Sequence, residues 1–270
     1  MAEPMNRQIA DDLQHRIESG ELAQGTQIPT EIDLREHYEA SRNTVRDAIK
    51  WLITRGLVET RPGQGTFVVE KINPFVTTLT GDPETGRGGG EGGPYIAEVA
   101  ASHRNPEISE PRVEIQKADR TVARSLRISE GDSVVSRHQQ RLIDETPWSL
   151  QTSFYPMTLV QRGATELIQA TDIQGGTVAY LAEKCGIEQA GYRDTIAVRP
   201  PDENEIRFFK LPADGRVSVF EIYRVGFDKE GNRFRLTVTV YPSDRNRLRV
   251  EVGDVPRRGH SADNADGLRE

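Results

Sequence analysis

The chain has 270 residues, of which 29% are charged and 35% apolar, and a formal net charge of −7. This length favours two domains, and the composition is typical of a globular protein. The sequence has no apolar run long enough for a transmembrane helix, no signal-peptide pattern, and a single cysteine, Cys185, which excludes an intramolecular disulfide and a cysteine metal cluster. We therefore expect a cytoplasmic protein with no cofactor, no metal and no membrane partner.

The charge is distributed unevenly near the N-terminus. Residues 1–40 hold three basic and nine acidic residues, whereas residues 41–71 hold six basic and three acidic ones. A basic segment on an acidic body favours modest, sequence-dependent affinity for nucleic acid over indiscriminate coating, which relies on many phosphate contacts.

The first predicted element is a helix over residues 5–20. Ile9, Leu13 and Ile17 recur every four residues, and Gly20 ends the pattern. A second, short helix follows Pro29. Thr30 is placed to cap this helix and Asp33 to complete a capping box.

A third helix is predicted from Ser41, which is a good N-cap, to Gly56. Its inward side carries an apolar stripe, formed by Val45, Ile49, Leu52 and Ile53. The opposite side carries Arg42, Asn43, Arg46, Asp47 and Lys50. Arginine can read guanine and asparagine can read adenine, so such a helix could dock in a DNA major groove.

Two short strands are predicted over residues 57–60 and 66–69, separated by a turn with two glycines. This hairpin has a basic tip that could reach a phosphate or a minor groove. Helix, short helix, tight turn, longer helix and hairpin is the order of a winged helix-turn-helix. The alternative is an ordinary surface helix and hairpin whose arginines merely face solvent.

The motifs resemble those of the GntR family of bacterial transcription regulators. The resemblance rests on Pro29-Thr-Glu, Ser41-Arg-Asn-Thr-Val-Arg46 and Gly63-Gln-Gly-Thr-Phe-Val68, and it covers residues 5–70. It implies that the recognition helix and the wing tip contact DNA. With their polar neighbours, the candidate DNA-binding residues are Arg42, Asn43, Thr44, Arg46, Arg61, Gln64 and Gly65.

One position departs from this family. Relatives carry a DNA-contacting arginine directly after the glutamate that matches Glu31, and this chain has Ile32 there. Arg35 is nearby but does not align, so the role is not transferred to it. We expect the affinity or the sequence preference to differ accordingly.

Residues 73–93 are rich in glycine and turn-forming residues, and we expect a linker there. A phosphate-binding loop is the alternative, but no Gly-Lys-Ser or Gly-Lys-Thr follows to begin a helix. The predicted organisation is a winged helix-turn-helix over 1–72, a linker over 73–93, a second domain over 94–253 and a disordered tail over 254–270.

The second domain mixes short helices with hairpins, which favours an antiparallel α+β fold. Strands are predicted over residues 112–117, 133–143, 148–155, 189–199, 217–228, 234–241 and 247–252, the last closing the sheet. Helices are predicted over residues 119–126, 159–170, 177–185 and 202–209.

This part resembles the UTRA effector domain of the HutC subfamily. The resemblance rests on the 137–155 hairpin with Pro147 and Tyr155-Pro156, on Gly176-Thr177 and on the 240–248 segment, and it runs over residues 95–250. It implies a fold like that of chorismate lyase, with a small molecule bound between the sheet and its helices.

The resemblance also implies which residues hold the effector. The candidates are Arg137, Gln139, Arg141, Gln151, Tyr155, Thr177, Arg235 and Tyr241. Relatives often carry arginine at Gln139 and glutamate at Gln151 and Arg235, and the loss of carboxylates favours a more anionic or differently shaped ligand. The helix start at Thr177 also favours an anion. For any single position, an ordinary polar group on a half-exposed strand is an equal alternative.

We therefore expect a homodimeric regulator, acting as a repressor, that binds an inverted-repeat operator in double-stranded DNA and is controlled by a small-molecule effector. The alternative is an enzyme of chorismate lyase-like fold with an accessory DNA-binding module. The five histidines show no metal spacing and no serine nucleophile elbow is present, which disfavours the enzyme. An architectural DNA binder would not need the second domain.

Overall fold

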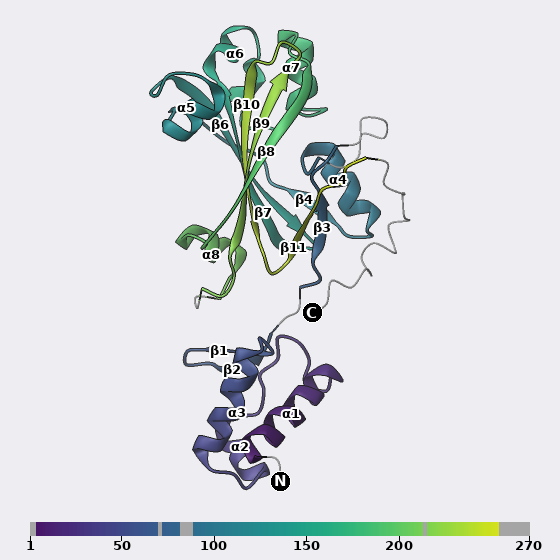
Figure 1. The fold of residues 1–270 in the computed structure, drawn as a ribbon, viewed down its shortest axis with the longest axis vertical. Helices are drawn as coiled ribbons and strands as arrows, with labels where there is room; N and C mark the ends of the chain where they lie inside the picture. The colour runs from purple at the N-terminus through teal and green to yellow at the C-terminus, as the bar shows by residue number, and fades with distance from the viewer. Residues whose placement is uncertain (1–3, 70–71, 82–88, 213–214, 254–270) are drawn as a thin grey trace. The chain divides into compact units, whose positions relative to one another are not determined.

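The computed structural model describes residues 4–69, 72–81, 89–212 and 215–253. The chain divides into two compact units, Met1–Asn73 and Pro74–Glu270 (Figure 1).

The N-terminal unit has three helices followed by a hairpin. They are α1 (Met5–Glu18), α2 (Glu31–His37), α3 (Arg42–Thr54), β1 (Val58–Arg61) and β2 (Gly65–Val68). The predicted caps are present. The Thr30 side chain accepts a hydrogen bond from the Asp33 backbone N–H, Asp33 accepts from the Thr30 N–H, and Ser41 accepts from the Thr44 N–H. The winged helix-turn-helix prediction is confirmed.

A single apolar core holds this unit together. The buried side chains come from all three helices and both strands and include Ile9, Leu13, Leu34, Val45, Leu52, Val58 and Val68. Trp51 packs at the edge of the core, with the guanidinium groups of Arg7 and Arg55 each 4.1 Å from its ring centre. The loop before α2 lies along the hairpin, because Ile28 donates to the Thr66 carbonyl at 2.9 Å.

The second unit is an α+β domain built on an antiparallel sheet. Its strands are β4 (Pro106–Ile108), β5 (Arg112–Lys117), β6 (Ser133–Ile143), β7 (Thr146–Pro156), β8 (Gln189–Arg199), β9 (Val219–Asp228) and β10 (Arg233–Pro242). The strand order is β4-β6-β7-β10-β9-β8, with β5 also paired to β6. The helices are α4 (Gly92–Ala101), α5 (Arg120–Leu126), α6 (Met157–Gln161), the 3-10 helix η1 (Thr165–Ile168), α7 (Thr177–Cys185) and α8 (Glu203–Phe209).

The two faces of this sheet differ in character. On one face, α5 packs over Leu236 and α8 packs over Val240. The other face, called here the polar face, carries a row of directly opposed residues on β6, β7, β10, β9 and β8. These residues are Arg137, Ser153, Thr237, Arg224 and Asp194.

Apolar layers cover the polar face at its two ends. At one end, α6, η1 and α7 pack over Tyr155. At the other end, Leu79 packs with Ile222 and Tyr241. In Figure 1, α4 with its neighbouring strands lies on the side of the sheet opposite to α5 and α8. The polar row therefore lies between two apolar layers.

The expected linker over residues 73–93 is wrong for much of its described part. Residues Phe75–Thr78 form β3, which pairs in parallel with β11 (Asn246–Arg249) as a separate two-stranded sheet. Phe75 and Leu79 are buried, so their alternation is that of a strand rather than a linker. Gly92 already belongs to α4. Residues 82–88 of the expected linker, and the expected tail over 254–270, lie outside the described residues.

Two further expectations are corrected. The last strand, predicted over 247–252, does not close the main sheet, because β11 pairs with β3 instead. The helix predicted over 159–170 is divided into α6 and η1 around Gly163, whose φ of +108° is incompatible with an α-helix.

Candidate functional site

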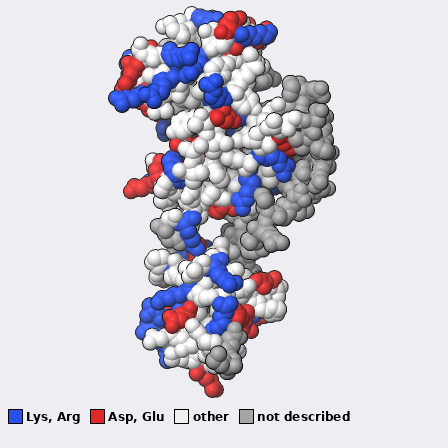
Figure 2. Space-filling view, viewed as in Figure 1, with Lys and Arg blue, Asp and Glu red and all other residues white. Residues whose placement is uncertain are grey.

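The N-terminal end of α3 presents an exposed polar surface. The side chains of Arg42 and Arg46 are 69% and 52% exposed, and Asn43 is also exposed. Val45 and Leu52 are fully buried on the other side of the helix. Figure 2 shows Lys and Arg side chains gathered on one flank of this unit, with a few acidic side chains among them. The residues predicted to read DNA bases therefore face solvent together.

Glu31, the first residue of α2, connects the two arginines. Its carboxylate lies 3.5 Å from the Nε of Arg42 and 3.9 Å from the Nε of Arg46. Thr44 is half-buried, and its hydroxyl lies 2.8 Å from that of Ser41, so it supports the helix start. Glu31 of α2 thus contacts both arginines, and their side chains stay more than half exposed.

The hairpin carries the remaining DNA-binding candidates. Arg61 folds back onto its own strand pair, with an Nη atom 2.9 Å from Glu59 and its guanidinium 4.4 Å from the Phe67 ring centre. Gln64 is exposed at the tip, and its carbonyl accepts from the Gln27 amide at 3.2 Å. Gly65 has a φ of +123°, which strains any L-residue with a side chain.

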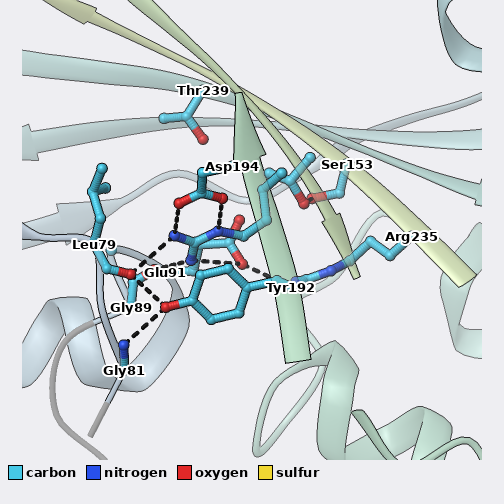
Figure 3. A network of polar contacts seen from close by, with 12 residues as sticks. Leu79, Gly81, Gly89, Glu91, Ser153, Tyr192, Asp194, Arg235 and Thr239 are labelled. Carbon is cyan, nitrogen blue, oxygen red and sulfur yellow. Dashed lines mark hydrogen bonds and ion pairs between the residues drawn. The ribbon is translucent and has the colours of Figure 1, made fainter. Parts of the chain in front are cut away.

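In the second unit, a network of arginines and carboxylates lies on the polar face (Figure 3). Arg141 is 2% exposed, and its two Nη atoms donate to the Gly90 carbonyl at 3.1 Å and to Gln151 Oε1 at 2.6 Å. Its guanidinium lies 4.6 Å from the ring centre of Tyr95. The Gln151 amide in turn donates to Glu91 Oε1 at 3.3 Å.

Glu91 lies where the two ends of this network meet. Its Oε2 atom is 2.8 Å from an Nη of Arg235 and 3.9 Å from an Nη of Arg224. Burial by itself raises the pKa of the Glu91 carboxyl, but Arg235, Arg224 and Arg141 together lower it below its ordinary value. The carboxylate is therefore held as an anion.

Arg224 completes the network on the side of β8. It donates to both oxygens of Asp194, at 2.7 and 2.6 Å, and its guanidinium stacks 3.8 Å from the Tyr192 ring centre. Burial lowers the pKa of Arg224, but Asp194 and Glu91 raise it, and the net shift is upward. Arg224 also donates to the carbonyls of Leu79 and Gly89, so the network attaches the segment on either side of residues 82–88 to the sheet.

Five of the eight effector candidates lie in this network or directly beside it. Arg141, Gln151 and Arg235 belong to it, and Tyr155 borders Arg235. Tyr241 is buried beside it, and burial raises the pKa of its phenol. These roles stay predictions.

The other candidates are differently placed. The Arg137 guanidinium donates to the carbonyls of Glu166, Leu167, Gln169 and Thr171. It therefore holds the segment at η1 to the sheet. Gln139 donates to the Ser109 carbonyl at 3.3 Å. Thr177 begins α7, and among the described residues no hydrogen bond joins it to the network.

The sequence predictions missed Glu91, Asp194 and Arg224. Glu91 stands within a glycine-rich run, where a carboxylate has no visible partner. Arg224 and Asp194 could have been noticed in the sequence, because each is a charged residue on a predicted strand. Their pairing depends on the register of β8 and β9, which aligns them directly opposite each other.

Metal-binding clusters and membrane-spanning helices are both absent from the described part of the chain. No cluster of three or more His, Cys, Asp or Glu side chains there could hold a metal ion. None of the helices in the same residues has the length and apolar character needed to cross a membrane.

Comparison with known proteins identifies both units. Residues 5–68 match the bacterial regulatory proteins of the gntR family, and residues 101–247 match the UTRA domain. The chain is 31% identical over 251 residues to the uncharacterized HTH-type transcriptional regulator SCO4628 of Streptomyces coelicolor, with 90% of each chain covered.

Two further likenesses agree. Over 157 residues the chain is 29% identical to MngR, the mannosyl-D-glycerate transport/metabolism system repressor of Escherichia coli, covering 58% of this chain and 60% of that protein, which is less than two thirds of its length. A crystal structure of a GntR-family transcriptional regulator aligns with a TM-score of 0.61 at 24% identity, over 94% of this chain and 99% of that one, and shows the shared fold. The regulatory family also overturns the enzyme alternative. The chain belongs to the GntR family of bacterial transcription regulators, in the HutC subfamily that joins a winged helix-turn-helix to a UTRA domain.

Proposed function

We propose that this regulator is an operator-binding repressor whose affinity for DNA is controlled by a small molecule bound on the polar face of the second unit. The observation that carries the DNA-binding part is the N-terminal turn of α3, where Arg42, Asn43 and Arg46 are exposed together on a helix whose other side is buried. Arginine and asparagine are the side chains that read guanine and adenine edges in the major groove.

The dimeric state is part of the proposal. One winged helix reads only a few base pairs, so a homodimer reading an inverted repeat would supply the length and symmetry that operators usually show. Repression follows if the bound dimer excludes RNA polymerase, which agrees with the function named for the relative MngR. The effector must bind the DNA-competent and incompetent states with different affinities, since otherwise it shifts nothing.

The effector part of the proposal is supported by the buried charges of the polar face. Arg141 and Arg235 are 2% and 7% exposed, and each has an Nε with no hydrogen-bond partner in the described residues. Buried donors are rarely left without a partner, and such groups often mark a functional site. We infer that an anionic effector binds here.

Footprinting tests the DNA-binding part. The purified chain should protect an inverted repeat in DNA flanking its own gene, and Arg46→Ala should weaken this binding by about 1–3 kcal/mol if the side chain reads a base. Arg112→Ala removes another exposed arginine, on β5 of the second unit, and should leave the footprint unchanged. Protection that is indifferent to sequence and lost with modest salt would contradict operator recognition.

A further inference from the structure

The carboxylate of Glu91 sits in the network in the way that a bound ligand would. It comes from the segment that precedes α4, whereas its partners come from the sheet. These partners are Gln151 on β7, Arg224 on β9 and Arg235 on β10, at 3.3, 3.9 and 2.8 Å. Gly90, the residue before Glu91, also receives a hydrogen bond from Arg141 through its carbonyl. The chain thus inserts an acidic group between arginines of two neighbouring strands, and Figure 3 shows Glu91 together with Arg235.

The charge balance of the network defines what could replace this group. Three guanidinium groups, those of Arg141, Arg224 and Arg235, face two carboxylates, those of Glu91 and Asp194. Asp194 already accepts two short hydrogen bonds from Arg224. If Glu91 leaves, the arginines exceed the carboxylates by two charges. Buried charges need compensation, so a group with two negative charges fits this site.

Unused donors point to the same class of ligand. The Nε atoms of Arg141 and Arg235 are buried without a hydrogen-bond partner in the described residues. A carboxylate has two oxygens, and those of Glu91 are already shared among Gln151, Arg224 and Arg235. A phosphate group or a pair of carboxylates has more acceptor oxygens and could satisfy the remaining N–H groups.

We propose that Glu91 occupies the subsite for a doubly negative group of the effector, and that the effector binds by displacing Glu91 from the arginines. This rests on the proposed function, in which the polar face holds the effector. Displacing Glu91 would also disturb the segment that leads to the DNA-binding unit. Glu98 on α4, the helix that starts next to Glu91, accepts a hydrogen bond from the Thr78 N–H of β3 at 3.2 Å. The N-terminal unit ends at Asn73, just before β3.

Inorganic phosphate binding to the full chain tests this displacement. It is measured by isothermal titration calorimetry at constant ionic strength, with potassium chloride as the balancing salt. The chain with Glu91→Gln should bind phosphate about tenfold or more tightly than the unaltered chain, as expected if Glu91 fills the site at least about nine-tenths of the time. Arg235→Gln in the Glu91→Gln chain should abolish this gain.

Glu221→Gln is the matched control. Glu221 is, like Glu91, a half-buried glutamate, with its side chain 16% exposed against 15% for Glu91, and it lies 2.8 Å from Arg199. It lies on β9 but on the opposite face of the sheet, because it stands directly across from Val240. This variant should bind phosphate as the unaltered chain does. An equal gain in Glu91→Gln and Glu221→Gln would overturn the proposal.

Malonate, which is a dicarboxylate, distinguishes a phosphate group from a pair of carboxylates as the source of the double negative charge. A gain for phosphate alone in the Glu91→Gln chain assigns the subsite to a phosphate group, and a gain for malonate alone assigns it to a dicarboxylate. Either result supports the displacement. If neither anion binds more tightly than in the unaltered chain, the subsite does not exist as proposed.

Hydrogen exchange on the unaltered chain gives a second test. The saturating anion is phosphate, or malonate if Glu91→Gln gains affinity for malonate alone. It should speed the exchange of a peptide covering residues 89–101 and slow that of a peptide covering β10. Unchanged exchange in both peptides would contradict displacement. Neither experiment contains DNA, so a chain that protects an operator but shows no anion effect keeps its proposed function and loses only this inference.

Discussion

At the scale of single residues, Ile32 is a large apolar side chain on a surface that we assign to DNA. It is 62% exposed, and its neighbour Glu31 contacts both Arg42 and Arg46. Exposed apolar residues are ordinary when they occur singly. Here, however, the side chain contributes no charge to the surface that we assign to DNA, so this surface has room for one more phosphate contact.

Ile32→Arg should therefore tighten DNA binding. One added phosphate contact should also steepen the dependence of log K on log salt by about 0.9. Fluorescence anisotropy with operator DNA across a salt series measures both quantities. Ile115→Arg introduces the same charge at a 57% exposed isoleucine of β5 and serves as the control. An identical slope change in the two variants would show that net charge alone, and not position, is responsible.

The lowered pKa of Glu91 should make the stability of the folded chain depend on pH. Its pKa in the folded chain is lowered from 4.5 by Arg235, Arg224 and Arg141, despite burial. A lowered carboxyl pKa stabilises the folded state fully above the unfolded value and loses this contribution as the pH falls through the folded value. The difference in unfolding free energy between the unaltered chain and Glu91→Gln should be constant near pH 7 and shrink below about pH 4.5. Urea unfolding at several pH values measures it, and a difference that stays constant to pH 3 would contradict the charged state inferred for Glu91.

At the scale of elements, helix starts were predictable because their signals are local. Thr30, Ser41, Asp119 and Asp202 all lie at helix N-termini, where their side chains accept backbone hydrogen bonds. The β3 strand was not predictable in this way, because its partner β11 lies far along the chain. The glycine run after β3 also obscured its short apolar alternation. Local chemistry therefore predicted the helices better than it predicted the pairing between distant segments.

The same distinction applies to the candidate site. The family resemblance was enough to name Arg141, Gln151 and Arg235 as candidates. The partner that joins them, Glu91, comes from outside the sheet, and no strand periodicity could have predicted it. Arg224 was passed over because its role depends on its alignment with Asp194.

The cap of α8 gives a prediction at this scale. Asp202 accepts from the backbone N–H groups of Asn204 and Glu205, each at 2.8 Å. Asp202→Ala should lower the unfolding free energy of the second unit by about 1 kcal/mol, since two N–H groups lose their acceptor. Asp202→Asn keeps a capping oxygen and should lose less. Urea unfolding of both variants measures the two losses of unfolding free energy. Equal losses would mean that the negative charge of Asp202, rather than its capping oxygen, stabilises the helix.

At the scale of the whole molecule, each unit has a hydrophobic core of its own. Leu52 is fully buried among the three helices of the N-terminal unit. Leu181 is fully buried in the apolar cluster that covers one end of the polar face in the second unit. Each unit therefore has the apolar interior that a cooperative unfolding transition requires.

Leu52→Ala should destabilise the N-terminal unit by about 2–5 kcal/mol, because it removes buried methyl groups and leaves a cavity. Calorimetry should show one of two thermal transitions moving to lower temperature while the other stays. Leu181→Ala should move the other transition instead. A single transition that both variants shift would mean that the two units unfold together.

The chain holds two tryptophans, and they are divided between the units. Trp51 has the guanidinium groups of Arg7 and Arg55 each 4.1 Å from its ring centre, whereas Trp148 is fully buried with Arg104 4.5 Å from its ring centre. The molecule thus carries one intrinsic fluorophore for DNA binding and another for the effector unit. Replacing either indole by phenylalanine leaves an emission spectrum that reports on one unit alone, without any added dye.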